Sequence, residues 1–213
     1  MSSYQDKVLA IQSRLEAIKI IPVLAACDPV VAPKLAETLI NNGLPCIEVT
    51  FRSETAIEVI KAIRTACPDM MLGSGTVLTK EHVDISIELG VDFAVSPGFN
   101  PDIVNYAKSK GLPFIPGVNN PSHVEQAMSL GINTLKFFPA DVSGGPGMLK
   151  ALGAVYPVKF MPTGGVKLTN VADYLKLSNV FCCGGTWMIP KDLIEQQNWE
   201  ELGKLTRAAA LIS

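Results

Sequence analysis

A lysine lies inside an apolar segment near the middle of the chain, where the sequence runs Thr134-Leu-Lys136-Phe-Phe138. In a β-strand, side chains alternate between two faces, so Thr134, Lys136 and Phe138 would share one face. Burial disfavours the charged ammonium and lowers the pKa of a lysine, and a neutral amine is a nucleophile toward carbonyl carbon. Lys136 is therefore a candidate reactive amine. The ordinary alternative is a lysine whose ammonium extends to the surface.

A second strand-like segment combines an acid with a cation, in the order Cys46-Ile-Glu48-Val-Thr50-Phe-Arg52. A carboxylate midway along a buried strand is costly unless it is paired or functional. Glu48 is therefore a candidate for proton transfer. Arg52 is a candidate for binding a carboxylate, because its planar guanidinium can donate to both oxygens. An internal Glu48–Arg52 ion pair is the structural alternative.

Two glycine pairs follow the last two strand-like segments, in Pro162-Thr-Gly-Gly165 and in Gly184-Gly-Thr186. Glycine exposes backbone N–H groups without a Cβ in the way, and loops at these places in a β/α barrel often bind phosphate. The pairs therefore indicate a phosphate site, and two tight turns are the alternative. The turns at Gly73-Ser-Gly-Thr76 and Ser96-Pro-Gly98 are less specific, although Thr76 offers a hydroxyl.

The elements that would carry these residues form a regular series. Eight strand-like segments, separated by helical patterns, occur at Lys19–Ala26, Pro45–Thr50, Met70–Gly73, Val91–Ser96, Leu112–Pro116, Asn133–Phe138, Val158–Pro162 and Asn179–Cys183. Mostly apolar strands that alternate with helices predict a parallel sheet covered on both faces. Eight units favour an α/β fold of the (β/α)8 TIM-barrel type, and an open doubly wound sheet is the alternative.

The predicted domain organisation is a single barrel domain over residues 1–213. An extra N-terminal helix would occupy residues 1–18, the barrel residues 19–190, and a C-terminal helix residues 191–213. In such a barrel the active site lies where the strands end, which would bring the candidate residues together. An amine, an acid, a carboxylate-binding cation and a phosphate site together suit a 2-keto acid with a terminal phosphate.

Composition narrows the classes of partner. The net charge is −2 without a basic cluster, which argues against nucleic acid. Apolar runs are too short to span a membrane, and the polar N-terminus is unlike a secretory signal, so a cytoplasmic protein is expected. The five cysteines are odd in number and mostly in apolar surroundings, which indicates reduced thiols. Isolated histidines and unsuitable ligand spacing argue against a metal site.

The ordered motifs resemble those of the KDPG (2-keto-3-deoxy-6-phosphogluconate) and 4-hydroxy-2-oxoglutarate (KHG) aldolase family. The resemblance runs from about Ile20 to Trp187 and rests on Glu48-Val-Thr-Phe-Arg52, Gly73-Ser-Gly-Thr76-Val, Ser96-Pro-Gly98, Leu135-Lys-Phe-Phe-Pro-Ala140, Pro162-Thr-Gly-Gly165 and Gly184-Gly-Thr-Trp187. It implies a homotrimeric class I aldolase of the Entner–Doudoroff route that needs neither cofactor nor metal.

The resemblance also implies a role for each matching residue. Lys136 matches the Schiff-base lysine, Glu48 the proton-transfer residue, and Arg52 and Thr76 the residues that hold the substrate carboxylate. The pocket would be lined by Pro97 and Phe138, and the phosphate held by Gly164, Gly165 and Thr186. The implied reactions are cleavage of KDPG to pyruvate and glyceraldehyde 3-phosphate, and of 4-hydroxy-2-oxoglutarate to pyruvate and glyoxylate.

This chain departs from the family pattern at three places. Thr186 stands where some members have serine, Asp141 where glutamate is common, and Ala25-Ala26 where some relatives carry an arginine. The third change bears on substrate preference, and the sequence leaves open whether the gluconate or the galactonate series is used. Two other hypotheses are a phosphosugar isomerase, epimerase or decarboxylase on the same barrel, with Lys136 acting non-covalently, and a phosphometabolite-binding protein without activity.

Overall fold

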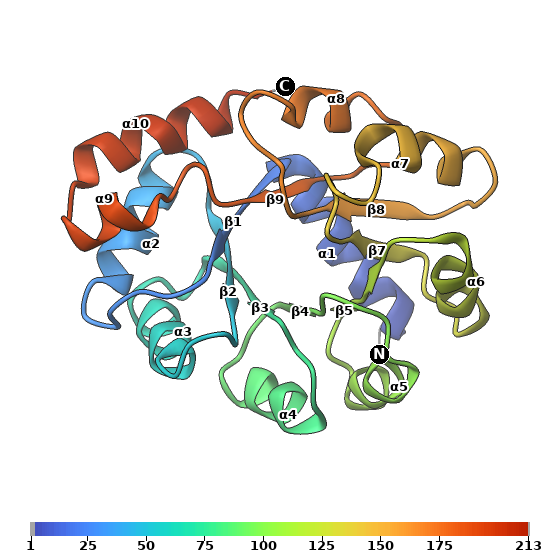
Figure 1. The fold of residues 1–213 in the computed structure, drawn as a ribbon. Coiled ribbons are helices and arrows are strands. Elements are labelled where there is room, and N and C mark those ends of the chain that lie inside the picture. Colours follow the sequence, from blue (N-terminus) through green and yellow to red (C-terminus); the bar gives the residue numbers. More distant parts are fainter. Residues whose placement is uncertain (1–2, 213) are drawn as a thin grey trace.

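The computed structural model describes residues 3–212. Parallel strands curl around a central axis and helices surround them on the outside, as Figure 1 shows. The chain alternates between strand and helix, so that consecutive parallel strands are joined by a crossover through the outer layer. This is the expected α/β arrangement with a curled parallel sheet.

The strands are short. They are β1 (Ile20–Leu24), β2 (Cys46–Thr50), β3 (Met71–Gly75), β4 (Phe93–Val95), β5 (Phe114–Ile115), β6 (Gly117–Val118), β7 (Thr134–Phe137), β8 (Lys159–Pro162) and β9 (Cys183–Gly185). The helices are α1 (Tyr4–Ile18), α2 (Ala32–Asn41), α3 (Ala56–Ala66), α4 (Lys80–Glu88), α5 (Pro101–Lys110), α6 (Pro121–Ser129), α7 (Gly145–Gly153), α8 (Val171–Leu175), α9 (Lys191–Glu195) and α10 (Trp199–Ala210).

All the strand pairs are parallel. One sheet has the order β5-β4-β3-β2-β1-β9 and the other the order β6-β7-β8. β5 and β6 lie on either side of Pro116, which has no N–H to donate and so interrupts the ladder. Single bridges join Phe160 to Val180 and Thr163 to Gly184. The end of β8 therefore lies beside the chain that leads into β9.

Side chains alternate between the interior of the curled sheet and the layer beneath the helices. Leu135 and Phe137 of β7 pack in the helix-facing cluster, as do Ile47 and Val49 of β2. Lys136 is buried and pairs across the interior, as the next subsection describes. The predicted alternation along the lysine segment is thus confirmed.

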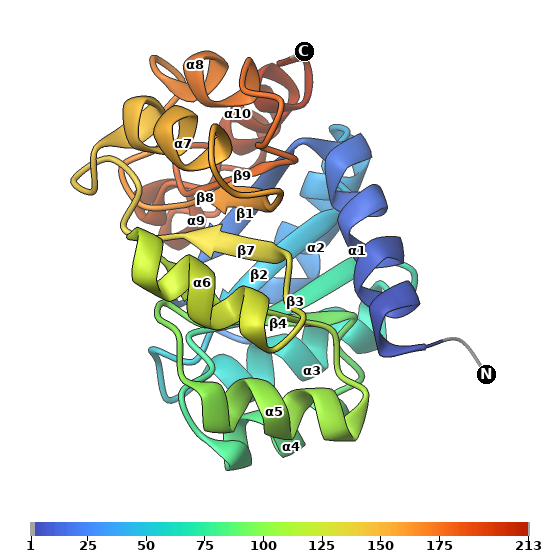
Figure 2. The same cartoon turned by 90° about the vertical axis from the view of Figure 1, so that its right-hand side faces the viewer.

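The interior is filled with apolar side chains at the end where the strands begin. Helix α1 lies across this end, as the side view in Figure 2 shows. Its Ile11 and Leu15 pack against interior residues that include Ile21, Cys46, Met71, Phe93, Val95, Ile115, Met161, Phe181 and Cys182. Thr134 at the start of β7 donates a hydrogen bond of 2.6 Å from Oγ1 to Gln12 Oε1 of α1. The helix thereby closes one end of the interior.

Helix α1 begins at a capping box. Ser3 Oγ accepts a hydrogen bond from the Asp6 backbone N–H at 3.1 Å, and Asp6 Oδ2 accepts one from the Ser3 N–H at 2.9 Å. These bonds satisfy backbone donors that the first turn of a helix leaves free. A helix thus occupies Tyr4–Ile18 of the segment 1–18 that was predicted as an N-terminal helix, and residues 1 and 2 lie outside the described residues.

The C-terminal segment differs from its prediction, because it contains two helices in place of one. Helix α9 ends at Glu195, and Gln197 then adopts a positive φ of 53°, which a continuous helix does not permit. Asn198 begins α10 by accepting a hydrogen bond from the Glu201 N–H at 3.2 Å. Residue 213, which the predicted helix included, lies outside the described residues.

Two predicted strands differ most from the observed ones. The segment predicted as Leu112–Pro116 contains only β5, and β6 follows Pro116 as a separate short strand. The segment predicted as Asn179–Cys183 becomes a ladder only at Cys183, where β9 starts to pair with Ile20 of β1. Gly184 and Gly185 consequently belong to a strand and not to the loop that follows it.

Candidate active site

Lys136 and Glu48 meet in the interior at the end opposite α1. Lys136 Nζ lies 3.0 Å from Glu48 Oε1 and 3.2 Å from Oε2, and the two side chains are only 6% and 1% exposed. β2 and β7 are not neighbours in either sheet, so the pair spans the interior. The ammonium also lies 5.7 Å from the centre of the Phe138 ring, which a cation favours. A buried amine and a buried carboxylate are thus within hydrogen-bond distance of each other.

The space for the Glu48 carboxylate depends on a glycine in the neighbouring strand. β2 and β3 pair with Glu48 beside Gly73 and Thr50 beside Gly75. A Cβ at Gly75 would overlap Glu48 Oε1. Gly75 therefore makes room for the carboxylate.

Arg52 lies just beyond the end of β2. Its Nε donates a 3.1 Å hydrogen bond to Thr50 Oγ1, and the Thr50 hydroxyl donates in turn to the Leu24 carbonyl at 3.2 Å. Within residues 3–212 no carboxylate forms an ion pair with Arg52, and its side chain is exposed. The alternative of a Glu48–Arg52 ion pair is therefore wrong, because Glu48 pairs with Lys136. The guanidinium is available to an anionic ligand.

Thr76 follows β3 directly and adopts a positive φ of 58°. Such a conformation costs a β-branched residue about 1–3 kcal/mol, and it is most often found at functional sites. The N–H of the next residue, Val77, donates to the Val95 carbonyl at 3.1 Å, which fixes the turn against β4. Thr76 is thereby held at the rim of the interior.

The loop after β8 has free backbone donors. Gly164 and Gly165 have φ values of 94° and 80°, and a Cβ at Gly165 would overlap Asp141. Neither Gly165 nor Val166 donates its backbone N–H to another residue within 3–212. Thr186, at the end of β9, is exposed beside this loop. The donors and the hydroxyl form a group that an oxyanion could bind.

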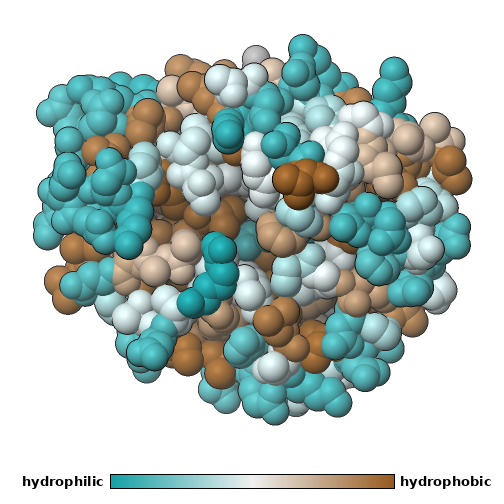
Figure 3. All heavy atoms as spheres, in the orientation of Figure 1, coloured by the Kyte–Doolittle hydropathy of each residue, from teal (hydrophilic) through white to brown (hydrophobic). Residues whose placement is uncertain are grey.

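These residues line a single cavity of about 410 Å³. Figure 3 shows that the face viewed in Figure 1 is hollowed near its centre. All the predicted site residues contribute to the lining, which comprises Val23, Glu48, Thr50, Arg52, Thr76, Pro97, Lys136, Phe138, Thr163, Gly164, Gly165, Val166, Gly185 and Thr186. The cavity has a volume suited to a small metabolite.

Thr163 is a polar lining residue that the sequence analysis did not single out. It is buried, and its Oγ1 has no hydrogen-bond partner within the described residues. A buried hydroxyl without a partner is costly, and this oxygen packs so closely against Gly184 that a Cβ there would overlap it. A signal was present, because Thr163 is the polar residue between an apolar strand and two glycines. The segment was interpreted from its two glycines, as a phosphate-binding turn.

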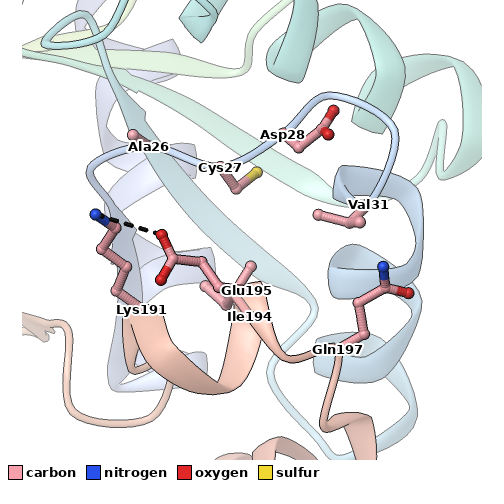
Figure 4. A pocket seen from close by; sticks show the side chains of 8 residues that line it. All are labelled: Ala26, Cys27, Asp28, Val31, Lys191, Ile194, Glu195 and Gln197. Carbon is pink, nitrogen blue, oxygen red and sulfur yellow. Dashed lines mark ion pairs between the residues drawn. The ribbon is translucent and has the colours of Figure 1, made fainter.

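A second cavity, of about 440 Å³, lies between the end of β1 and α9, and Figure 4 shows its lining. Its cation, Lys191, pairs with Glu195 at 3.4 Å. Burial, with a smaller contribution from Asp28, raises the pKa of the Cys27 thiol to about 11, so the thiol is a poor nucleophile. The Lys191–Glu195 pair is exposed, whereas the Lys136–Glu48 pair is buried.

Two further observations concern the described part of the chain. Residues 3–212 contain no group of three His, Cys, Asp or Glu side chains that could hold a metal ion. None of the described helices has both the length and the apolar character needed to cross a membrane.

Residues 11–205 match the family described as KDPG and KHG aldolase. The chain belongs to the KDPG and KHG aldolase family. It is 46% identical to the 2-dehydro-3-deoxy-phosphogluconate aldolase of Haemophilus influenzae, over 91% of this chain and 92% of that one. It is 36% identical to the KHG/KDPG aldolase of Escherichia coli K12, over 93% of each chain.

A solved KDPG aldolase from Legionella pneumophila shares the fold. It has a TM-score of 0.90 and 36% identity, over 93% of this chain and 97% of the other. In that structure pyruvate is captured at low pH as a covalent carbinolamine intermediate. The resemblance predicted from the motifs is thus confirmed at the level of the family.

Proposed function

We propose that this protein is a class I aldolase that cleaves KDPG to pyruvate and glyceraldehyde 3-phosphate. The observation that carries the proposal is the buried pair of Lys136 and Glu48, 3.0 Å apart, in a cavity that is also lined by an available guanidinium. Family membership and the carbinolamine captured in the Legionella pneumophila enzyme support imine chemistry. Cleavage of 4-hydroxy-2-oxoglutarate follows as a second activity, as the name of the Escherichia coli relative suggests.

The first half of the reaction forms the imine. Glu48 accepts a proton from the Lys136 ammonium, and the free amine attacks the C2 ketone to form a carbinolamine. Glu48 then returns a proton to the departing hydroxyl, and loss of water leaves an iminium. The pair at 3.0 Å suits both transfers, because donor and acceptor are already within hydrogen-bond distance.

The second half breaks the carbon–carbon bond. The C4 hydroxyl loses its proton to Glu48, directly or through a water molecule, and the C3–C4 electrons move into the iminium. The aldehyde departs and leaves an enamine on Lys136. Protonation of the enamine carbon and hydrolysis of the iminium release pyruvate and the free amine. In this role Lys136 withdraws electrons through the imine and no metal ion is required.

The remaining residues position the substrate. Arg52 and Thr76 hold the carboxylate next to the ketone, since the guanidinium has no ion-pair partner within residues 3–212. Pro97 and Phe138 line the pocket. The free N–H groups of the Gly164-Gly165-Val166 turn and the Thr186 hydroxyl hold the phosphate, so that Gly164, Gly165 and Thr186 form the phosphate site.

The architecture completes the proposal. We propose that the two sheets close into one (β/α)8 barrel domain with the extra helix α1, because bridges at Phe160–Val180 and Thr163–Gly184 link β8 to the chain around β9. The match to one family over residues 11–205 supports a single domain. A homotrimer and a cytoplasmic location remain predictions. Light scattering of the purified protein should give three times the mass of the chain, and the mass of a single chain would contradict the trimer.

A direct test of the activity uses the two C4 epimers. Incubation with KDPG should release pyruvate and glyceraldehyde 3-phosphate in equal amounts, each measured with a coupled dehydrogenase. The galactonate epimer should react more slowly than KDPG. A faster reaction would identify the galactonate epimer as the preferred substrate. Failure to release pyruvate from either epimer would contradict the aldolase.

A further inference from the structure

A depression extends from the catalytic cavity along the end of β1. A neighbouring cavity of about 350 Å³ shares Val23 and Thr186 with the catalytic cavity. It also shares Ala26, Lys191 and Ile194 with the 440 Å³ cavity of Figure 4. The three cavities therefore adjoin in sequence and form a groove that begins inside the active site.

The groove begins next to the proton-transfer residue. Val23 lies beside Glu48 in the register of β1 and β2. In the proposed mechanism Glu48 acts at the C4 oxygen, which is the aldehyde oxygen after cleavage. A substituent on C4 can thus extend past Val23 into the groove, toward Thr186.

The walls of the middle cavity are mainly apolar. They comprise Val23, Leu24, Ala25, Ala26, Ile189, Pro190 and Ile194, with Thr186 and Lys191 as the polar residues. Ala25 and Ala26 are exposed and have the shortest side chains that retain a Cβ, so the space between the end of β1 and α9 is left open. Such walls bind a hydrocarbon chain better than a polyol.

Within residues 3–212 the groove offers no free cation to a terminal anion. Lys191, which lines both the middle and the outer cavity, is paired with Glu195 at 3.4 Å. Asp28 also lines the outer cavity, but its carboxylate points away from this pair in Figure 4 and accepts the Val30 N–H at 2.9 Å. A tail that ends in an anion would therefore lose hydration against the apolar walls without gaining an ion pair, whereas a neutral tail would not.

We infer that this groove binds the neutral, apolar tail of a 4-hydroxy-2-keto acid, and that the enzyme therefore also adds pyruvate to unphosphorylated aliphatic aldehydes. The inference rests on the proposed function, because it uses the same enamine. The enamine carbon attacks the aldehyde carbon, Glu48 gives a proton to the aldehyde oxygen, and the nitrogen becomes an iminium. Water then hydrolyses the iminium, which releases the ketone and restores the Lys136 amine. The reverse steps cleave the same compounds.

A series of aldehydes tests the inference with the wild-type protein alone. With saturating pyruvate, kcat/KM should rise from propanal through butanal and pentanal to hexanal, about two- to fourfold for each methylene buried. The 4-hydroxy-2-keto acid product is measured by mass spectrometry. If kcat/KM stays constant or falls from propanal to hexanal, the groove does not bind the tail and the inference is wrong. 6-Oxohexanoate has the length of hexanal but ends in a carboxylate, and it should react more slowly than hexanal. A faster reaction would contradict the inferred preference for a neutral tail.

A pair of matched variants locates the tail. Ala26→Trp fills the groove and should abolish the rise from propanal to hexanal. Ala154→Trp places the same side chain on another exposed alanine, after α7, and should preserve the rise. A rise that persists in Ala26→Trp would show that the tail binds elsewhere. The wild-type series remains decisive if Ala26→Trp does not fold.

Pyruvate trapping separates the two proposals. Reduction with borohydride should leave a pyruvate adduct on Lys136 in the wild-type protein and in both variants. An adduct together with a constant kcat/KM along the aldehyde series would contradict tail binding in the groove and leave the proposed aldolase activity standing. Absence of any adduct in the wild-type protein would contradict both proposals.

Discussion

The two ends of the sheet interior are built from the same strands and carry opposite chemistry. Near the start of β2 the interior residue is Cys46, packed among apolar side chains and closed off by α1. Two residues further on, the interior residue is Glu48, which pairs with Lys136 in an open cavity. A step of two residues is about 7 Å along a strand. An apolar layer and a cavity with a buried amine and carboxylate can thus be adjacent layers of one interior.

The ionisable groups of the two ends differ in the same way. Burial in the closed end raises the pKa of the thiols of Cys46, Cys182 and Cys183, which keeps them neutral. At the open end the Lys136 amine and the Glu48 carboxylate lie 3.0 Å apart. The closed end therefore contains neutral thiols, and the open end contains an amine and a carboxylate as a hydrogen-bonded pair.

Loss of the amine should have the largest effect. Lys136→Met should reduce turnover of KDPG by more than about 10⁴-fold, because removal of a nucleophile leaves no route to the imine. It should also lower the free energy of unfolding by about 3–5 kcal/mol, since Glu48 is left buried and unpaired. Turnover is measured by pyruvate release and stability by urea denaturation.

The double variant Lys136→Met/Glu48→Gln is the control for the stability effect. Removing the unpaired carboxylate should restore part of the lost stability without restoring any turnover. Residual turnover of Lys136→Met within tenfold of the wild-type value would contradict the role of the lysine.

Loss of the carboxylate alone should have the next effect. Glu48→Gln should slow turnover of KDPG by about 10²- to 10⁴-fold, the usual contribution of a general acid–base. The pyruvate adduct should still form on Lys136, more slowly, because the amine remains. Single-turnover trapping separates the two rates. An unchanged turnover rate would assign proton transfer to another group.

A substitution in the closed end should lower stability and leave turnover almost unchanged. Phe93 is fully buried in the apolar layer, so Phe93→Ala should lower the free energy of unfolding by about 3–5 kcal/mol. Turnover per folded molecule should stay close to the wild-type value. Phe93→Leu is the milder control. A large loss of turnover in a fully folded sample would show that the two layers are coupled.

The smallest effect is expected at the rim. Thr186→Ala should lower kcat/KM for KDPG by about 10- to 100-fold, the contribution of a hydrogen bond to a charged group. It should leave 4-hydroxy-2-oxoglutarate, which has no phosphate, almost unaffected, and Thr186→Ser should behave like the wild type. Equal losses on both substrates would contradict the phosphate assignment.

Local rules were sufficient to predict which residues face the interior. The alternation of side chains predicted that Lys136 and Glu48 would lie on inner faces, and the strand order then brought their segments to one end. The contact between them was not predictable, because it joins residues 88 positions apart on strands that are not neighbours. The sequence suggested a buried amine, and the structure adds its carboxylate partner.

Other differences arose where backbone geometry or close packing decides the outcome. The break between α9 and α10 depends on a positive φ at Gln197, a residue without a strong preference for that conformation. The role of Gly75 depends on the carboxylate of a neighbouring strand, and the free hydroxyl of Thr163 on the absence of a partner in three dimensions. Neither the packing of Gly75 nor the environment of the Thr163 hydroxyl can be predicted from neighbouring residues in the sequence.

Reductive trapping tests the central claim most directly. The folded protein is saturated with pyruvate, treated with sodium borohydride and mapped by peptide mass spectrometry. The account predicts one reduced pyruvate adduct, on Lys136, and none on Lys159, a lysine at the start of β8 whose ammonium donates to the Ser178 carbonyl at 2.6 Å. The absence of an adduct on Lys136, or an adduct on Lys159 in its place, would contradict the imine mechanism.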